Sequence, residues 1–490
     1  MVDILKMYIN GEWVISESGK TREIFNPATG EVIAKVTEGT EVDVRVAVEA
    51  AKHAFYNTQW GENTFDRASY LYKLADELEK RVDEFARIET LDNGKPLRES
   101  VYDVHDAAAC FRYYAGYINK PHGETYNVQD TMQAMVVREP IGVCGQIVPW
   151  NYPLLMGTWK LAPALAAGNT LVFKPSEITP LSMIKLFELI DELGFPKGVV
   201  NLVLGEGKTV GHEIASNMGV DKIAFTGGTA TGRSIMKAAT TNIKKISLEL
   251  GGKSPNIVFA DADFETAVDY ALFGIFANQG QVCSAGSRLL LEESIYDKFL
   301  ERLTDRAKKI VVNKGTEEGV EMGPLVSKEH MEKVLQYIEI GKEEGARLLC
   351  GGYQITTGEL GKGNFVAPTI FADTTPDMRI VQEEIFGPVL VVQKFKDEKE
   401  AIALANNTIY GLAGGVFTND IAKAHRVIKR LRAGITWINS YHPTYNEAPW
   451  GGYKQSGIGR ELGSFGYEEY TEVKQININL CVEPIGWFQN

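Results

Sequence analysis

The sequence predicts an α/β fold with a Rossmann-type parallel sheet, a second α/β domain and a small β element. Three observations lead to this fold. The chain has 490 residues, enough for two to four domains. Short β-rich runs alternate with helical runs, which favours right-handed crossovers and a parallel sheet covered on both faces. A glycine-rich turn follows one β-rich run and opens a helix, an arrangement that favours nucleotide binding.

Covering helices and then a parallel sheet are expected in the first half. From Val44 to about Ser100, apolar residues recur at three- and four-residue spacing, which indicates helices. From Ala134 onward, β-rich runs alternate with helical ones. The β-rich runs are 136–148, 170–175, 199–204, 221–227 and 244–251, and the helices are 159–167, 181–193, 210–216 and 232–239.

A second α/β region runs from about Ser254 to Asn439, with strands at 255–261 and 288–293 and helices at 264–276 and 295–309. The stretches from Tyr117 to Val136 and from Glu468 onward are expected to be extended. An exposed strand edge there would invite pairing with another subunit. We therefore divide the chain into a nucleotide-binding α/β unit (1–117 and 140–250), a second α/β unit (251–455) and extended segments (118–139 and 468–490) through which copies of the chain would pair in a homo-dimer or homo-tetramer.

Composition and charge narrow the class of protein. Hydrophobic residues make up 44% and charged residues 23% of the chain, so a folded globular protein is expected. The 51 basic and 64 acidic residues leave a net charge of −13, which opposes nucleic-acid binding. Small molecules are therefore the expected partners.

A cytoplasmic location is predicted. The sequence contains no run of 18 apolar residues and no basic stretch followed by a long apolar one at its start, so neither a membrane span nor a secretory signal is expected. No metal site is expected, since the chain lacks C-x-x-C and histidine pairs at ligand spacing. Five scattered cysteines are typical of free thiols in a reducing compartment: Cys110, Cys144, Cys283, Cys350 and Cys481.

The glycine-rich turn is ambiguous by itself. The run FTGGTATGRSIM (225–236) follows a predicted strand and carries Gly227 and Gly228 before a helix. Such glycines let a phosphate approach backbone N–H groups and the helix N-terminus. The run is not G-x-G-x-x-G, and Arg233 stands where a P-loop has lysine, which argues against an NTPase. A plain strand-to-helix connection fits equally well.

Seven separated motifs remove this ambiguity. Their order, spacing and chemistry strongly resemble the aldehyde dehydrogenase superfamily over nearly the whole chain. The resemblance implies a Rossmann-type cofactor domain, an α/β catalytic domain and a small β oligomerisation element. The surroundings of Tyr152, Trp159 and Trp450 look most like the betaine aldehyde dehydrogenase branch. The motifs are PWNYP (149–153), KPSE (174–177), FTGG (225–228), LELGGKSP (248–255), GQVCSAGSR (280–288), EEIFGP (383–388) and PWGGYKQSGIGRELG (449–463).

The resemblance implies NAD-dependent oxidation of an aldehyde to a carboxylic acid. A thiolate that adds to an aldehyde forms a thiohemiacetal, which can pass a hydride to a nicotinamide. By resemblance, Cys283 is the nucleophile, and the Asn151 amide with the backbone N–H of Cys283 holds the oxyanion. Glu249 activates the water that hydrolyses the thioester. Lys160 and Glu461 would relay the proton, although either could be an ordinary salt-bridging residue.

For the cofactor, the resemblance implies NAD. Lys174 and Glu177 contact the adenosine ribose in this family, and a carboxylate there repels the 2′-phosphate of NADP. Lys174 partly offsets this repulsion, so NADP stays possible. Glu384 would hold the nicotinamide ribose and Phe386 would pack beside the nicotinamide. The expected cofactor contacts are Ile147, Val148, Trp150, Lys174, Ser176, Glu177, Gly207, Phe225, Thr226, Gly227, Gly228, Leu250, Glu384 and Phe386.

Two substrate classes stay open. Tyr152, Trp159 and Trp450 stand where betaine aldehyde dehydrogenases hold a trimethylammonium group by cation–π attraction, so betaine aldehyde or a related aminoaldehyde is the leading substrate. Ala277 stands where that branch usually has another large aromatic residue. A roomier pocket, with Tyr441–Pro449 in its wall, would instead suit bulky aliphatic, aromatic or retinoid aldehydes.

Two further hypotheses come from other classes. An activated thiol with an oxyanion hole could also act as a cysteine esterase, but no His or Asp partner motif for the thiol is visible. Ester cleavage is then a side activity. A non-enzymatic, crystallin-like structural protein is the other alternative. The joint presence of Cys283, Glu249 and Asn151 argues against it.

Overall fold

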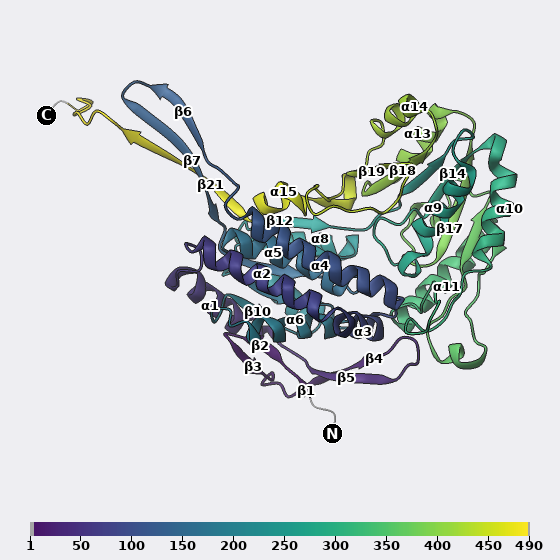
Figure 1. The fold of residues 1–490 in the computed structure, drawn as a ribbon, viewed down its shortest axis with the longest axis horizontal. Helices are drawn as coiled ribbons and strands as arrows, with labels where there is room; N and C mark the ends of the chain where they lie inside the picture. The colour runs from purple at the N-terminus through teal and green to yellow at the C-terminus, as the bar shows by residue number, and fades with distance from the viewer. Residues whose placement is uncertain (1–3, 489–490) are drawn as a thin grey trace.

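A computed structural model describes residues 4–488, which form two α/β halves and a projecting β arm (Figure 1). The first half, purple to teal, carries most of the N-terminal 250 residues. The second half, mainly green, lies beside it, and the arm points away from both. Within the described residues, no helix has the length and apolar character needed to cross a bilayer.

An eight-stranded sheet forms the centre of the first half. Its five central strands run parallel, as predicted, while antiparallel strands that the sequence analysis did not predict close both edges. In spatial order the strands are β20 (Gly457–Ile458), β12 (Lys245–Glu249), β11 (Lys222–Thr226), β8 (Val143–Ile147), β9 (Thr170–Lys174), β10 (Val200–Leu202), β2 (Met7–Ile9) and β3 (Glu12–Val14).

The central strands end together at one edge of this sheet. Ile147 of β8 is aligned with Lys174 of β9 on one side and with Phe225 of β11 on the other. Thr226 of β11 is aligned with Glu249 of β12. The strand order reverses beside β8, because β9 and β11 lie on opposite sides of it. Open α/β sheets bind ligands outside the carboxyl ends of their strands at such a reversal.

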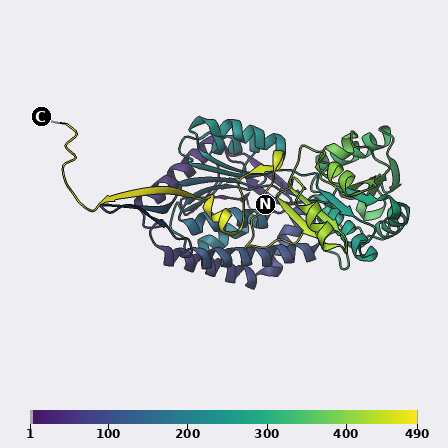
Figure 2. The ribbon, with the colours of Figure 1, turned by 90° about the horizontal axis from the view of Figure 1, so that it is seen from above.

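Helices cover both faces of the sheet (Figure 2). The helix after Pro96 extends well past the predicted limit at Ser100, because Val104, Ala107 and Phe111 bury one side of it. Another helix begins at Pro153, before its predicted start at Trp159, and proline suits a first helical turn. The helices are α1 (Glu41–Asn57), α2 (Thr64–Lys80), α3 (Val82–Asn93), α4 (Leu97–Tyr117), α5 (Pro153–Ala167), α6 (Leu181–Glu192), α7 (His212–Ser216) and α8 (Thr229–Ala238).

The second half contains a seven-stranded sheet, parallel except for one edge strand. In spatial order its strands are β15 (Arg347–Cys350), β16 (Thr369–Ala372), β17 (Val389–Phe395), β14 (Arg288–Glu292), β13 (Pro255–Val258), β18 (Ala413–Phe417) and β19 (Ile435–Ile438). The helices are α9 (Phe264–Phe276), α10 (Tyr296–Ala307), α11 (Lys328–Glu343), α12 (Arg379–Gln382), α13 (Glu398–Asn406) and α14 (Ile421–Ile428). After this half, the chain returns to the first sheet through β20 and α15 (Gly463–Glu468).

Two three-stranded sheets complete the fold, a mixed one near the N-terminus and an antiparallel one in the projecting arm. One lies near the N-terminus and contains β1 (Ile4–Leu5), β5 (Val32–Thr37) and β4 (Thr21–Phe25). The projecting arm contains β21 (Thr471–Asn479), β7 (Met132–Pro140) and β6 (Glu124–Gln129) in that order, so β21 is an edge strand. Eight of the nine β21 residues are exposed, so its alternating apolar side chains face no core of this chain.

Candidate active site

The loop that carries Cys283 is held in a strained conformation. Asn278, Gln279 and Gly280 have φ values of 43°, 56° and 72°, a left-handed run that costs free energy and persists only where surrounding contacts fix it. A Cβ on Gly280 would lie 2.1 Å from the Gly387 carbonyl oxygen. The Gln279 amide oxygen accepts the Gly323 N–H at 3.1 Å. These contacts place Cys283 rigidly after α9.

Asn151 lies next to this loop with a donor to spare. The buried side chain of Asn151 donates from Nδ2 to the Gln281 carbonyl oxygen at 2.9 Å. The backbone carbonyl oxygen of Asn151 accepts a hydrogen bond from the Asn278 side-chain amide at 3.0 Å. A side-chain amide has two N–H donors. The second N–H of Asn151 can therefore stabilise an oxyanion on a carbon attached to Cys283.

The Cys283 sulfur lies among acidic groups. Burial and the carboxylates of Glu249 and Glu384 raise the pKa of Cys283 to about 12, although backbone N–H groups of Ser284 and Cys283 itself oppose the shift. The free protein therefore holds a neutral thiol at neutral pH. Both Glu249 and Glu384 therefore lie near the nucleophile.

Glu249 ends β12 beneath a glycine-rich segment, residues 450–461, which we call the strap. A Cβ on Gly451 of the strap would lie 2.9 Å from Glu249 Oε1, and one on Gly457 would lie 2.2 Å from the Leu248 carbonyl. Glycine is therefore required for the strap to approach the strand. Burial and Glu461 raise the pKa of Glu249 well above its usual value, and its Oε2 has no hydrogen-bond partner among residues 4–488.

Lys160 and Glu461, predicted as a proton relay, form a buried ion pair. The Lys160 ammonium also donates to Thr226 Oγ1 at 2.6 Å. The strap supplies Glu461, whose backbone exchanges two hydrogen bonds of 2.7 Å with that of Trp450. Since Glu461 raises and Lys160 lowers the pKa of Glu249, the ion pair lies near the predicted base.

The predicted cofactor residues gather at the carboxyl edge of the first sheet. The Lys174 ammonium lies 3.2 Å from the Glu177 carboxylate. Burial raises the pKa of Glu177, but Lys174 and backbone N–H groups, including that of Gly207, lower it overall. Strand ends or the loops after them supply Ile147, Val148, Trp150, Lys174, Ser176, Phe225, Thr226, Gly227, Gly228 and Leu250.

Two glycines shape this edge for a dinucleotide. Gly228 precedes α8, and a Cβ there would meet nothing within 4 Å, so the helix N-terminus is open to a phosphate. A Cβ on Gly251 would lie 2.1 Å from Glu384 Oε2, and Glu384 Oε1 accepts the Gly252 N–H at 3.0 Å. Phe386 has a left-handed φ of 62°. This ring packs edge-on against Trp150, with centroids 5.1 Å apart.

A cavity of about 520 Å³ lies on the other side of Cys283. Its wall includes Cys283, Tyr152, Trp159 and Trp450, so the structure brings the predicted substrate residues together around the nucleophile. Trp159 and Trp450 pack edge to face at 5.6 Å. The predicted wall segment also contributes, through Tyr441, His442, Pro443 and Thr444.

The sequence analysis missed the acidic part of this wall. Glu99, Asp103 and Asp106 of α4 all line the cavity. Burial raises the pKa of Glu99 and of Asp103 to about 7, against the opposing effect of Lys95. Burial also raises the pKa of Asp106. Their spacing, i, i+4 and i+7, places them on one helix face. This spacing was the available signal, once the helix was known to continue past Ser100.

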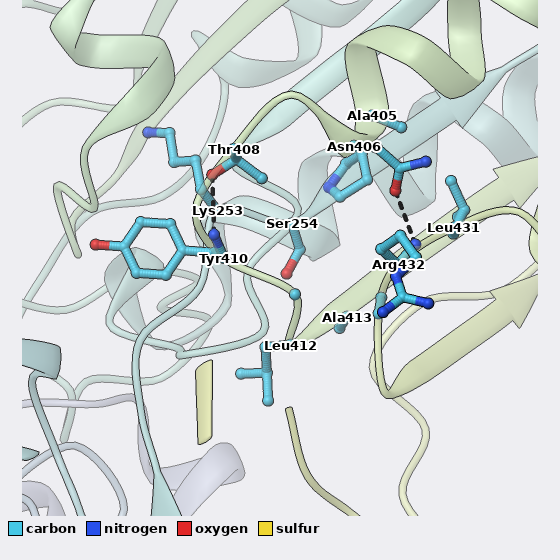
Figure 3. A pocket seen from close by; sticks show the side chains of 13 residues that line it. Lys253, Ser254, Ala405, Asn406, Thr408, Tyr410, Leu412, Ala413, Leu431 and Arg432 are labelled. Carbon is cyan, nitrogen blue, oxygen red and sulfur yellow. Dashed lines mark hydrogen bonds between the residues drawn. The ribbon is translucent and has the colours of Figure 1, made fainter. Parts of the chain in front are cut away.

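A second pocket, between Lys253 and Arg432, is much smaller (Figure 3). Its volume is about 10 Å³, which is room for about one water molecule. The Lys253 side chain points away from Arg432, and Asn406 Oδ1 accepts the Arg432 backbone N–H at 2.7 Å. Neither an aldehyde nor a dinucleotide fits there.

Comparisons with known proteins agree with the motifs. The model of the "Aldehyde dehydrogenase family" matches residues 13–476. The chain is 54% identical over 487 residues to "Betaine aldehyde dehydrogenase" of Bacillus subtilis, covering 99% of each sequence. Retinal dehydrogenase 2 of Mus musculus is 49% identical, with 97% of this chain and 92% of that protein covered.

A solved structure is equally similar. A crystal structure of betaine aldehyde dehydrogenase from Staphylococcus aureus, in complex with NAD⁺, is 50% identical with a TM-score of 0.98 and covers 99% of this chain and 97% of that one. The family match and the two relatives each cover most of the chain. The chain therefore belongs to the aldehyde dehydrogenase family, and the resemblance predicted from its seven motifs is confirmed.

Proposed function

We propose that the protein uses NAD to oxidise a positively charged aldehyde, betaine aldehyde or a related aminoaldehyde, to its carboxylic acid. One observation carries the proposal: Cys283 lies on the wall of the aromatic and acidic cavity, while its backbone carbonyl packs against Gly252, whose N–H binds the predicted ribose-binding Glu384. The nucleophile therefore lies where the cavity meets the cofactor edge.

The first chemical stage uses Cys283 and Asn151. The Cys283 thiol gives its proton up to solvent and its sulfur adds to the aldehyde carbon, which converts the carbonyl oxygen to an oxyanion. The free Asn151 N–H and the Cys283 backbone N–H stabilise that charge as it develops. NAD, when bound, accepts the hydride that the substrate carbon loses. The strained loop keeps the sulfur and the amide in place throughout.

The second stage uses Glu249. When Glu249 is ionised, its raised pKa makes the carboxylate a stronger base than an ordinary glutamate, so it can take a proton from the water that attacks the thioester carbon. The carboxylic acid leaves and the Cys283 thiol is restored. Glu461 and Lys160 lie where they can accept the proton and pass it outward.

The cofactor edge supports NAD. An ion pair between Lys174 and Glu177 offers a donor and an acceptor to the two ribose hydroxyls, and the Glu177 carboxylate disfavours a 2′-phosphate. The open N-terminus of α8 suits the pyrophosphate. The related Staphylococcus aureus structure holds NAD⁺, which supports the same assignment.

The substrate class is supported by charge and by relatives. Three carboxyl groups, against the single guanidinium of Arg98, line the same cavity as Tyr152, Trp159, Trp450 and further aromatic rings, a combination that attracts a cation by Coulomb and cation–π forces. Two similar proteins are named betaine aldehyde dehydrogenases. Bulky aldehydes are a second candidate, because the cavity of about 520 Å³ is large and Ala277 leaves one side of it open.

A paired-substrate assay tests this proposal. Betaine aldehyde and 3,3-dimethylbutanal have the same shape and differ by one positive charge. With NAD, we expect kcat/KM at least 10-fold higher for betaine aldehyde, since a charge of this kind is worth a few kcal/mol in a partly buried site. Equal values, or higher values for retinal and long-chain aldehydes, would favour the second candidate.

We also propose a cytoplasmic homo-oligomer. The arm presents an unpaired β21 edge and exposed Val473, Ile476 and Ile478, which another copy of the chain would cover. The five cysteines are unpaired, which supports a reducing compartment. Removal of residues 471–490 should convert a dimer or tetramer to monomers in light scattering; an unchanged mass would refute the role of the arm.

A further inference from the structure

A fully buried lysine lies directly behind the cavity wall. Lys95 connects α3 and α4 and is completely buried. Its ammonium donates to Asp103 Oδ2 at 2.7 Å and to Glu89 Oε1 at 3.1 Å, and it lies 4.4 Å from the centre of the Tyr152 ring. An ammonium has three donors. Two carboxylates and one aromatic ring are therefore enough to engage all three N–H donors of the Lys95 ammonium.

Two of these three partners belong to the cavity. Both Tyr152 and Asp103 line it. Asp103 Oδ2 is taken by Lys95, whereas its Oδ1 accepts no hydrogen bond from the described part of the chain and can face a ligand. Glu89 acts differently, because its Oε2 accepts the Leu154 N–H at 3.2 Å and so holds the start of α5. Lys95 thus connects Glu89, which holds the start of α5, with Asp103, which lines the cavity.

The charge of Asp103 depends on Lys95. Burial favours the neutral acid and raises the pKa of Asp103 to about 7, while the neighbouring Lys95 ammonium is the first influence that opposes the rise. Glu89, which is also negative, works in the same direction as burial. Without the ammonium, burial would raise the pKa of Asp103 further and favour the neutral acid at neutral pH. The cavity would then carry less negative charge.

We propose that Lys95 is a positioning residue that sets the charge selectivity of the cavity. Its ammonium favours the carboxylate form of Asp103 by donating to it and lies against the Tyr152 ring, so that a cationic aldehyde is preferred over a neutral one of the same shape. The inference deepens the proposed function and rests on its substrate class.

A purely structural role is the competing explanation. Buried ion pairs often contribute to folding without any part in ligand recognition. Such a role would alter the stability, or the kcat/KM of charged and neutral substrates alike. A role in selectivity changes the ratio of the kcat/KM values for the charged and the neutral substrate. A purely structural role would leave this ratio unchanged.

The test compares Lys95→Met, Asp103→Asn and the double variant, each with betaine aldehyde and 3,3-dimethylbutanal. Methionine keeps the length of the side chain and packs well against an aromatic ring. We expect Lys95→Met to lower the ratio of the two kcat/KM values about 10-fold, with kcat for 3,3-dimethylbutanal within about 3-fold of the wild type. Asp103→Asn should lower the ratio to a similar extent.

The double variant shows whether Lys95 acts through Asp103. If it does, Lys95→Met has no further effect on the ratio once Asp103 is asparagine, which is the non-additivity expected of coupled residues. Lys185→Met is the matched control. Lys185 also pairs with two glutamates, Glu84 and Glu188, but lies on α6 and does not line the cavity. For Lys185→Met, the ratio of the two kcat/KM values should match that of the wild type.

The outcomes separate the two proposals. A wild-type protein without preference for the cation refutes the substrate class. A wild-type preference that Lys95→Met leaves unchanged, or an equal loss for both substrates, overturns the role of Lys95 alone. If Lys95→Met does not fold, Lys95→Met/Glu89→Gln removes the charge pair together, and its ratio must fall about 10-fold for the inference to stand.

Discussion

The cofactor edge and the aldehyde cavity are built in different ways. At the edge, aligned strand ends, backbone N–H groups and glycines without side chains form most of the site. In the cavity, side chains from α4, α5, α9 and the loop after β19 meet around Cys283. The edge therefore follows from the sheet, whereas the cavity exists only because distant segments pack together.

This difference separates what a substitution can do. A change at the edge alters how closely a ligand can approach the backbone, so it should act on cofactor binding. A change in the cavity alters charge, shape or the nucleophile, so it should act on the aldehyde and on chemistry. Cys283 and Glu249 lie between the two regions and allow the sharpest test.

The largest effect is expected for Cys283→Ala. Loss of the nucleophile should reduce aldehyde oxidation by at least about 10³-fold, because no other group can form the covalent intermediate. The Kd for NAD, measured by fluorescence titration, should change less than about 3-fold, because the edge is formed by other residues. Residual turnover near the wild-type rate would contradict the mechanism.

Glu249→Gln should not affect hydride transfer but should slow hydrolysis of the thioester. Removal of a general base typically costs about 10²- to 10⁴-fold. Stopped-flow absorbance should show a rapid burst of NADH followed by steady turnover about 10²-fold slower than in the wild type. Loss of the burst would mean that Glu249 acts before hydride transfer.

The pH dependence of the Cys283 thiol tests its environment. Since burial and two carboxylates raise its pKa to about 12, the thiolate fraction grows with pH throughout the neutral and mildly alkaline range. Without NAD, alkylation of the Cys283 peptide by iodoacetamide should rise about 10-fold per pH unit from pH 7 to 9. Mass spectrometry distinguishes it from the exposed Cys481. A plateau below pH 8 would contradict the raised pKa.

Gly251→Ala should weaken the edge specifically. The added Cβ would lie 2.1 Å from Glu384 Oε2 and must displace that carboxylate. We expect the KM for NAD to rise about 10-fold, since an interaction with a charged group is worth up to a few kcal/mol. Gly61→Ala is the control, because its Cβ would meet no atom closer than 3.8 Å and Gly61 is not among the predicted cofactor contacts, so the KM for NAD should stay unchanged. Equal effects would show that close approach at Gly251 does not matter.

The smallest effect is expected for Glu177→Gln. Loss of the carboxylate removes the repulsion of a 2′-phosphate while Lys174 remains. The ratio of kcat/KM for NAD to that for NADP should fall about 5-fold, which is roughly 1 kcal/mol. Glu192→Gln, on the surface beside Arg81, is a suitable control for the loss of one charge. An unchanged ratio would remove the ribose argument.

The sequence predicted the edge better than the cavity. Strand periodicity placed the strands that end at Lys174, Thr226 and Glu249 in one parallel sheet, because aligned strand ends follow from local patterns. The site roles of Lys174 and Glu249 came from the family resemblance and stay predictions. The three aromatic residues were found only through the family resemblance. Asp103 and Lys95 were missed, since their meeting depends on the packing of α3, α4 and α5, which no local pattern records.

Two backbone hydrogen bonds of the strap connect a residue of the cavity wall with a residue of the predicted proton relay. Trp450 lines the cavity, while Glu461, its partner in these two hydrogen bonds, forms the ion pair with Lys160. A mutation that reshapes the pocket at Trp450 would thus also disturb proton release. Evolution toward new aldehydes would meet less conflict at Thr444 or Ala277, which touch the cavity without taking part in these two hydrogen bonds.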